Sequence, residues 1–134
     1  VPFDVERAPD LQARAATVDF LVVAVPGGAE TRHLIDAQVF DAMQPHAHLI
    51  NIARGDVVDE AALVDALRGG HIGGAGLDVY AFAPRVPQAL LALDNVTLLP
   101  HLGTAALEVR TDMGRMAVAN IGAFLKGDPL PNPV

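Results

Sequence analysis

The sequence contains no cysteine, no serine and no tryptophan. Without cysteine there is no disulfide, no thiolate nucleophile and no cysteine-ligated zinc, and without serine there is no serine nucleophile. No apolar run reaches the length of about 18 residues that a membrane-spanning helix needs. No basic amino-terminal segment leads into an apolar run, as it would in a signal peptide. We therefore expect a cytoplasmic protein with no part in a membrane.

Positive charge is also scarce. The chain has 9 Lys and Arg residues against 16 Asp and Glu residues, which gives a formal net charge of −7. The basic residues are scattered, so nucleic-acid backbones and anionic membrane surfaces are poor candidate partners. The length of 134 residues and the apolar fraction of 51% fit a single α/β domain whose strands are buried on both faces.

The most informative stretch runs from Leu49 to Gly70. Leu49 to Ala53 is a short apolar run that predicts a buried strand. Asp59 is a good N-cap for an amphipathic helix that ends at two glycines. Arg54 therefore lies on a strand-to-helix loop at the carboxyl end of a strand, where open α/β sheets bind ligands. Its guanidinium suits a carboxylate or phosphate; the alternative is a solvated loop charge or a structural ion pair.

The rest of the chain alternates between strand and helix patterns. Residues 1–9 predict an entering loop or edge strand. Further strands are predicted at Asp19 to Pro26, His71 to Tyr80 and Asn95 to Pro100, and helices at Asp10 to Ala16, Asp36 to Met43 and Leu90 to Leu93. This alternation predicts a parallel sheet with helices on both faces, in three layers.

A long helix is predicted from Ala105 to about Lys126, with Thr104 as its cap and Gly127 after its end. Its expected apolar face includes Leu107, Met113, Met116 and Ile121.

Polar residues follow three of the predicted strands. Arg54, Asp78 and His101 converge on one edge if the strands are parallel. His101 could serve as a general acid or base, or as a capping or surface histidine. Asp78 could accept a hydrogen bond from an amide or cap the next turn. His46 and His48 alternate as metal ligands can, but no third ligand is near, so no metal site is predicted.

Glycines follow or occupy two of the strands. Gly27 and Gly28 directly follow Pro26 and permit close approach of a ligand to the backbone, or simply form a tight turn. The glycines between His71 and Tyr80 are not a G-x-G-x-x-G followed by a helix, so no phosphate loop is predicted there.

Three motifs follow one another along the chain: Asn51-Ile-Ala-Arg-Gly-Asp-Val-Val-Asp-Glu-Ala-Ala-Leu, Gly74-Ala-Gly-Leu-Asp-Val-Tyr and Leu99-Pro-His-Leu-Gly-Thr-Ala. In order and spacing they closely resemble the D-isomer-specific 2-hydroxyacid dehydrogenases, which include glyoxylate/hydroxypyruvate reductases and phosphoglycerate dehydrogenases. The resemblance runs from about Asp10 to Lys126. It implies a partial Rossmann-like sheet, NAD or NADP as cofactor, and hydride transfer between nicotinamide and a small 2-keto or 2-hydroxy acid.

The resemblance also implies roles for individual residues. Arg54 would bind the carboxylate and carbonyl side of the substrate, and His101 would protonate the carbonyl oxygen. Asp78 would hold the nicotinamide carboxamide. Residues implied to line the cofactor are Pro26, Ile52, Ala53, Arg54, Asp78, His101 and Gly103.

The chain departs from the family pattern at Ala83. The family normally has a glutamate there, just before the proline, which hydrogen-bonds the catalytic histidine and raises its pKa. In Tyr80-Ala-Phe-Ala-Pro this carboxylate is missing, as is the usual acidic residue at Ala81. We therefore expect a slow or altered enzyme, or one in which another carboxylate substitutes.

The family's first half is also missing from this sequence. It would supply the amino-terminal part of the substrate domain, the Gly-rich pyrophosphate loop and the residue that separates NAD from NADP. Residues 1–134 would thus be the C-terminal part of the NAD(P)-binding domain, with the helix of residues 105–126 returning toward the absent substrate domain. We expect a fragment, or a piece paired with its missing half or with a symmetry partner, and a homodimer. The rivals are a non-catalytic dinucleotide-binding relative and a purely oligomer-forming remnant.

Overall fold

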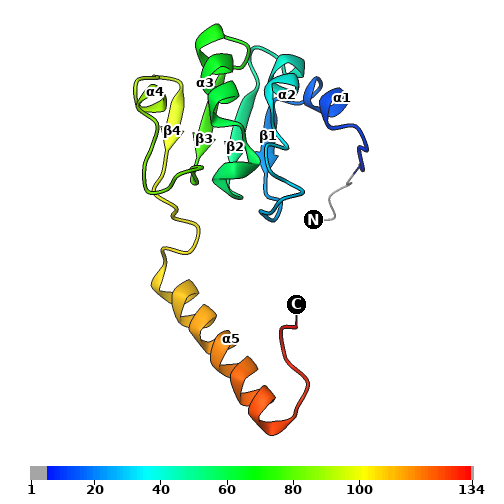
Figure 1. Cartoon of the computed structure of the whole chain (residues 1–134), viewed down its shortest axis with the longest axis vertical. Helices are drawn as coiled ribbons and strands as arrows, with labels where there is room; N and C mark the ends of the chain where they lie inside the picture. The colour runs from blue at the N-terminus through cyan, green and yellow to red at the C-terminus, as the bar shows by residue number, and fades with distance from the viewer. Residues whose placement is uncertain (1–5, 134) are drawn as a thin grey trace. The chain divides into compact units, whose positions relative to one another are not determined.

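The computed structural model describes residues 6–133 and divides into two compact units, Val1–Pro100 and His101–Val134. The helices and strands of the first unit, labelled in Figure 1, are α1 (Leu11–Ala15), β1 (Phe20–Val23), α2 (Ala37–Ala42), β2 (His48–Asn51), α3 (Glu60–Gly69), β3 (Gly74–Leu77), α4 (Gln88–Leu91) and β4 (Val96–Leu98). A 3₁₀ turn, η1 (Gly55–Val57), lies between β2 and α3. The second unit contains α5 (Leu107–Lys126). Of the predicted entering segment, residues 1–5 lie outside the described part, and residues 6–9 form a loop.

The predicted parallel sheet is confirmed. Its four strands are all parallel and follow one another in the order β1-β2-β3-β4. The carboxyl ends of neighbouring strands therefore meet at one edge. The ladder continues past the strand ends, because Ile52 N donates to Val23 O at 3.1 Å and Leu99 N donates to Leu77 O at 2.9 Å. This regular pairing fixes where the loops begin that carry the candidate site residues.

Helices cover one face of this sheet. A strand order without reversal, joined by right-handed crossovers, places α2, α3 and α4 on the same side. Burial alternates accordingly, since Val23 and Leu49 are 4% and 0% exposed, whereas Phe20 and Val22 are 62% and 55% exposed. The expected second helical layer is therefore not supplied by the described helices of the first unit. The open face keeps apolar side chains that the sequence pattern predicted to be buried.

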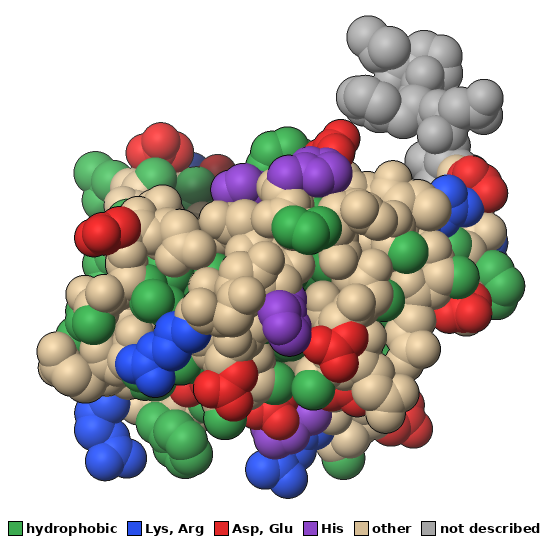
Figure 2. Space-filling view, turned by 90° about the horizontal axis from the view of Figure 1, so that it is seen from above, with side chains coloured by type: hydrophobic (Ala, Val, Ile, Leu, Met, Phe, Trp, Pro, Cys, Tyr) green, Lys and Arg blue, Asp and Glu red, His purple; other side chains and the backbone are tan. Residues whose placement is uncertain are grey.

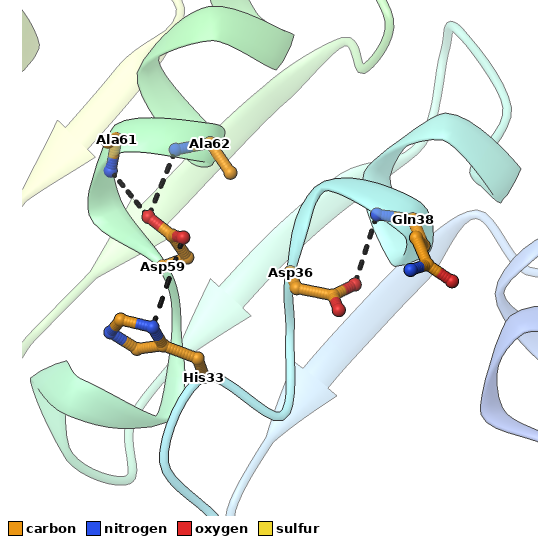
Figure 3. A network of polar contacts seen from close by, with 6 residues as sticks. All are labelled: His33, Asp36, Gln38, Asp59, Ala61 and Ala62. Atoms are coloured by element: carbon orange, nitrogen blue, oxygen red, sulfur yellow. Dashed lines mark hydrogen bonds and ion pairs between the residues drawn. The ribbon is translucent and has the colours of Figure 1, made fainter.

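Aspartate caps begin three of the helices: those at Asp10 and Asp59 were predicted as caps, and Asp36 was predicted only as the start of its helix. Asp10 accepts from Ala13 N, Asp36 accepts from Gln38 N at 3.0 Å, and Asp59 accepts from the first-turn amides of α3. Figure 3 shows Asp36 and Asp59, with His33 Nδ1 lying 3.9 Å from Asp59 Oδ2. Each carboxylate satisfies amides that have no partner within the helix, which is why local sequence alone located these helix starts.

The long helix starts later than predicted. It runs over Leu107–Lys126 with Ala106 at the N-cap position, and no side chain caps it. The prediction that Thr104 caps it is therefore wrong: the carbonyl of Thr104 instead accepts from Arg110 Nε at 3.1 Å. The predicted end is confirmed, because Gly127 adopts the left-handed conformation there. No residue of α5 is buried.

Within residues 6–133, no helix combines the length and the apolar character that crossing a membrane requires. On the face seen in Figure 2, histidine side chains lie among acidic ones. His46 Nε2 lies 2.8 Å from Asp19 Oδ1, and His71 Nδ1 lies 3.2 Å from Asp41 Oδ1. His46 and His71 are both exposed, and each lies beside a single aspartate.

Candidate functional site

A pocket opens at the carboxyl ends of β1 and β2. Its volume is about 700 Å³, within the range of small-molecule sites. The lining comes from the two loops that leave these strands: Ala24, Val25, Pro26, Gly27, Gly28, Ile52, Ala53 and Arg54. The structure thus brings together four of the residues predicted for the site, Pro26, Ile52, Ala53 and Arg54.

Arg54 is held from several sides. Its aliphatic stem crosses Gly27 so closely that a Cβ on Gly27 would lie 2.7 Å from Arg54 Cγ. Its Nη1 donates to Ala53 O at 2.7 Å. Asn51, only 1% exposed, donates from Nδ2 to Arg54 O and accepts at Oδ1 from Ala53 N, both at 3.0 Å. Because the buried side-chain amide of Asn51 holds the backbone of the loop, the exposed guanidinium of Arg54 extends from a fixed backbone position.

The opposite wall of the pocket is also fixed. The Thr31 hydroxyl donates to Pro26 O at 2.8 Å and folds the Gly27–Gly28 turn back on itself. Farther along the same loop, His33 N donates to Asp56 O at 2.8 Å. The loop after β1 is therefore tied both to itself and to η1, so the pocket is preformed.

Asp78 occupies the carboxyl end of the next strand, as predicted. It is 8% exposed, and its backbone N donates to Asn51 O at 3.1 Å. Asn51 thus links the Asp78 backbone through its carbonyl and the Arg54 loop through its side chain. One buried asparagine on strand β2 therefore positions the backbone at both candidate residues.

His101 and Gly103 belong to the second unit. His101 is exposed and adopts a left-handed backbone conformation with φ of 59°. Such conformations cost a non-glycine residue about 1 kcal/mol or more and gather at functional sites. The roles predicted for His101 and Gly103 remain predictions.

Several residues that position the site were not predicted from the sequence. Asn51 was counted as part of a motif, but its clamp on Arg54 was not foreseen. Tyr80 is also buried, and its hydroxyl donates to Leu99 O at 2.8 Å, which joins the exits of β3 and β4. The one sequence signal for Asn51 was a polar residue inside an otherwise apolar strand pattern. Among residues 6–133, no group of three or more His, Asp or Glu side chains could hold a metal ion.

The phenol of Tyr80 should ionise only above its ordinary pKa of 10.0. Burial is the largest cause of its raised pKa, and the charges of Asp78 and Glu60 raise it further. The pKa of Tyr80 is higher in the folded than in the unfolded chain, so the neutral phenol contributes to the free energy of unfolding. This contribution is complete below pH 10 and is lost as the pH rises through the folded-state pKa. The tyrosinate absorbance that distinguishes the protein from its Tyr80→Phe variant measures this titration. Half-ionisation at or below pH 10 in the folded protein would contradict it.

Comparisons with known proteins agree with this geometry. Residues 3–103 match the family described as D-isomer specific 2-hydroxyacid dehydrogenase, NAD binding domain. A hydroxyphenylpyruvate reductase from Plectranthus scutellarioides is 49% identical over 120 residues, which are 90% of this chain and 38% of that protein. A glyoxylate/hydroxypyruvate reductase from Arabidopsis thaliana is 45% identical over 126 residues, 94% of this chain and 40% of that protein.

Solved structures give the same result. An NADPH-dependent glyoxylate/hydroxypyruvate reductase from Sinorhizobium meliloti, in complex with NADP and malonate, has a TM-score of 0.91 at 46% identity and covers 95% of this chain and 40% of that one. The holo form of D-mandelate dehydrogenase from Rhodotorula graminis has a TM-score of 0.93 at 38% identity, covering 100% of this chain and 41% of that one. The chain thus spans about two fifths of these relatives. It belongs to the D-isomer specific 2-hydroxyacid dehydrogenase family, whose NAD-binding domain is matched by residues 3–103.

Proposed function

We propose that the protein carrying this chain is an NAD(P)-dependent oxidoreductase that interconverts a small 2-keto acid and the D-2-hydroxy acid, with glyoxylate and hydroxypyruvate as the first substrates to test. The observation that carries the proposal is the preformed pocket at the carboxyl ends of β1 and β2, with Arg54 clamped at its rim. A fixed guanidinium beside an open pocket suits a small carboxylate ligand. The names of the matched reductases support the substrate class.

The pocket and the neighbouring Asp78 offer groups that suit part of a nicotinamide dinucleotide. Gly28 leaves the backbone after β1 open, since nothing lies within 4 Å of a Cβ built on it, whereas the Arg54 stem covers Gly27. Ile52 is 56% exposed and offers an apolar surface for a flat ring. The Asp78 carboxylate is an acceptor that suits a carboxamide N–H₂. We assign cofactor contacts to Pro26, Ile52, Ala53, Arg54, Asp78, His101 and Gly103, with NAD or NADP as the cofactor.

Arg54 and His101 would perform the chemistry on the substrate. When bound, the nicotinamide cofactor would supply the hydride for reduction of the carbonyl. The Arg54 guanidinium pairs with the substrate carboxylate, which orients the neighbouring carbonyl. His101 donates a proton to the carbonyl oxygen, and in the reverse direction it takes the proton from the hydroxyl.

We further propose that residues 1–134 are the C-terminal part of the NAD(P)-binding domain, with residues 105–126 returning toward a substrate domain. The protein would work as a homodimer in the cytoplasm. The uncovered sheet face, with Phe20 and Val22 exposed, supports burial against further protein. The absence of cysteine suits a reducing compartment.

The direct test is reduction of glyoxylate and hydroxypyruvate by the full-length protein, followed as loss of reduced nicotinamide absorbance with NADH and with NADPH. Saturable turnover of either acid is expected. Dinucleotide binding without turnover of either acid would favour the second candidate function, a catalytically weak or inactive dinucleotide-binding relative. Ala83, where the family carries a carboxylate, is the observation that favours this second candidate.

Replacing Ala83 by glutamate should increase kcat for reduction by about tenfold or more. The family resemblance implies that a carboxylate at this position would hydrogen-bond the proposed acid and stabilise its protonated form, so activity in the reducing direction should persist to higher pH. The pH profile of kcat measures this effect, and Ala83→Gln, which lacks the charge, is the matched control. Equal profiles for the glutamate and glutamine variants would exclude the charge effect.

A further inference from the structure

The Tyr80–Ala81 peptide lies directly against the Arg54–Gly55 turn. Gly55 is buried, and a Cβ placed on it would lie 1.9 Å from the Tyr80 carbonyl carbon and 2.2 Å from the Ala81 nitrogen. The two backbones therefore touch with no side chain between them. Because packed groups leave no free space, the loop after β2 and the loop after β3 can shift against each other only if this contact is broken.

Glu60 holds the same peptide from α3. Its Oε1 accepts a hydrogen bond from Ala81 N at 2.8 Å, in a partly buried position. Glu60 is the first residue of α3, only a few positions after Gly55, so its carboxylate reaches from one loop to the other. Hydrogen bonds to an ionised carboxylate are stronger than bonds between neutral groups.

This bond lies close to a candidate ligand-binding residue on each loop. Arg54 directly precedes Gly55, and Asp78 lies three residues before Ala81. Glu60 is not among the residues that line the pocket. Its direct contact with the site is through the backbone that it holds.

We propose that Glu60 is a positioning residue. By accepting the Ala81 N–H, it fixes the loop that carries Asp78 against the loop that carries Arg54, and so sets the separation of the two side chains. The proposal rests on the proposed dehydrogenase function, in which Arg54 binds the substrate carboxylate and Asp78 binds the cofactor carboxamide.

A different explanation is that Glu60 only stabilises α3, since a negative charge in the first turn interacts favourably with the helix dipole. Two conservative variants separate the explanations. Glu60→Asp keeps the charge but shortens the side chain by one methylene, so its oxygens fall short of Ala81 N. Glu60→Gln keeps the length and a carbonyl oxygen that can accept the bond, but loses the charge.

The experiment uses the full-length protein and three measurements: kcat and KM for the 2-keto acid, Kd for the dinucleotide, and hydrogen exchange at the Ala81 amide. For Glu60→Asp we expect kcat to fall about tenfold, with weaker dinucleotide binding and about tenfold faster Ala81 exchange. Glu60→Gln should stay within about threefold of the wild type on each. Glu108, an exposed residue in the first turn of α5, is the matched control position, and Glu108→Asp and Glu108→Gln should change none of the three.

Three results would overturn the proposal. A larger loss of kcat in Glu60→Gln than in Glu60→Asp would assign Glu60 to helix stabilisation. Faster Ala81 exchange in Glu60→Asp with unchanged kcat and Kd would show that the bond forms without positioning the site. If the wild type lacks turnover, the proposed function fails, and the dinucleotide Kd then decides: weaker binding by Glu60→Asp supports positioning, and equal binding contradicts it.

Discussion

Replacing Arg54 by alanine should lower kcat/KM for glyoxylate by about a thousandfold. Among the described residues that line the pocket, Arg54 alone carries a charge, so loss of its guanidinium would leave the substrate carboxylate without a charged partner there. Arg54→Lys should still lose about a hundredfold, because a single ammonium cannot reproduce the planar fork that binds both carboxylate oxygens. Steady-state kinetics with each cofactor measures both variants.

The control for this prediction is Arg68→Lys, an exposed arginine in the last turn of α3, which should leave kcat/KM unchanged. Added guanidinium ion should restore part of the activity of Arg54→Ala, since the loop backbone stays clamped by Asn51. Wild-type kcat/KM in Arg54→Lys would mean that Arg54 is a solvated loop charge, the alternative that the sequence left open.

Replacing Gly55 by alanine should destabilise the fold by about 3 kcal/mol or more and abolish most of the activity. The new Cβ would lie 1.9 Å from the Tyr80 carbonyl carbon, and the obstructing atoms are backbone, which cannot rotate away as a side chain would. The turn that carries Arg54 would therefore be pushed from the segment that follows Asp78. Denaturant unfolding measures the loss, with the slope of the transition checked for two-state behaviour.

Gly114→Ala provides the matched comparison. Gly114 lies inside α5, and nothing approaches within 4 Å of a Cβ built on it. The same substitution there should be neutral or stabilising by up to about 1 kcal/mol, because alanine favours the helix. Equal effects of the two substitutions would show that the contact between Gly55 and Tyr80 is not rigid.

Features set by local chemistry were predictable from the sequence. Asp36 and Asp59 mark helix starts because a short carboxylate satisfies the amides next to it. Gly70 and Gly127 mark helix ends because the left-handed conformation suits glycine. Thr104 has the right chemistry for a cap, but α5 begins only at Leu107, and residue type alone does not fix the position of a helix start.

Contacts between distant segments were not predictable. Gly55 touches Tyr80, and Glu60 bonds to Ala81, across more than twenty positions of sequence. No periodicity encodes such contacts, because they depend on how two loops leave neighbouring strands. The exposure of Val22 was not predictable either, because the sequence of an apolar strand is the same whether or not a second layer covers that face of the sheet. The convergence of strand ends was predictable, because it follows from parallel topology alone.

The left-handed backbone at His101 limits how its chemistry can be dissected. With φ of 59°, this position disfavours β-branched side chains and tolerates glycine and asparagine. A valine or threonine there would combine the loss of the imidazole with a change of backbone shape, and the measured defect would have two origins. Asparagine suits this backbone conformation and removes only the imidazole, so His101→Asn is the substitution that tests the proposed proton donor without a change of backbone shape.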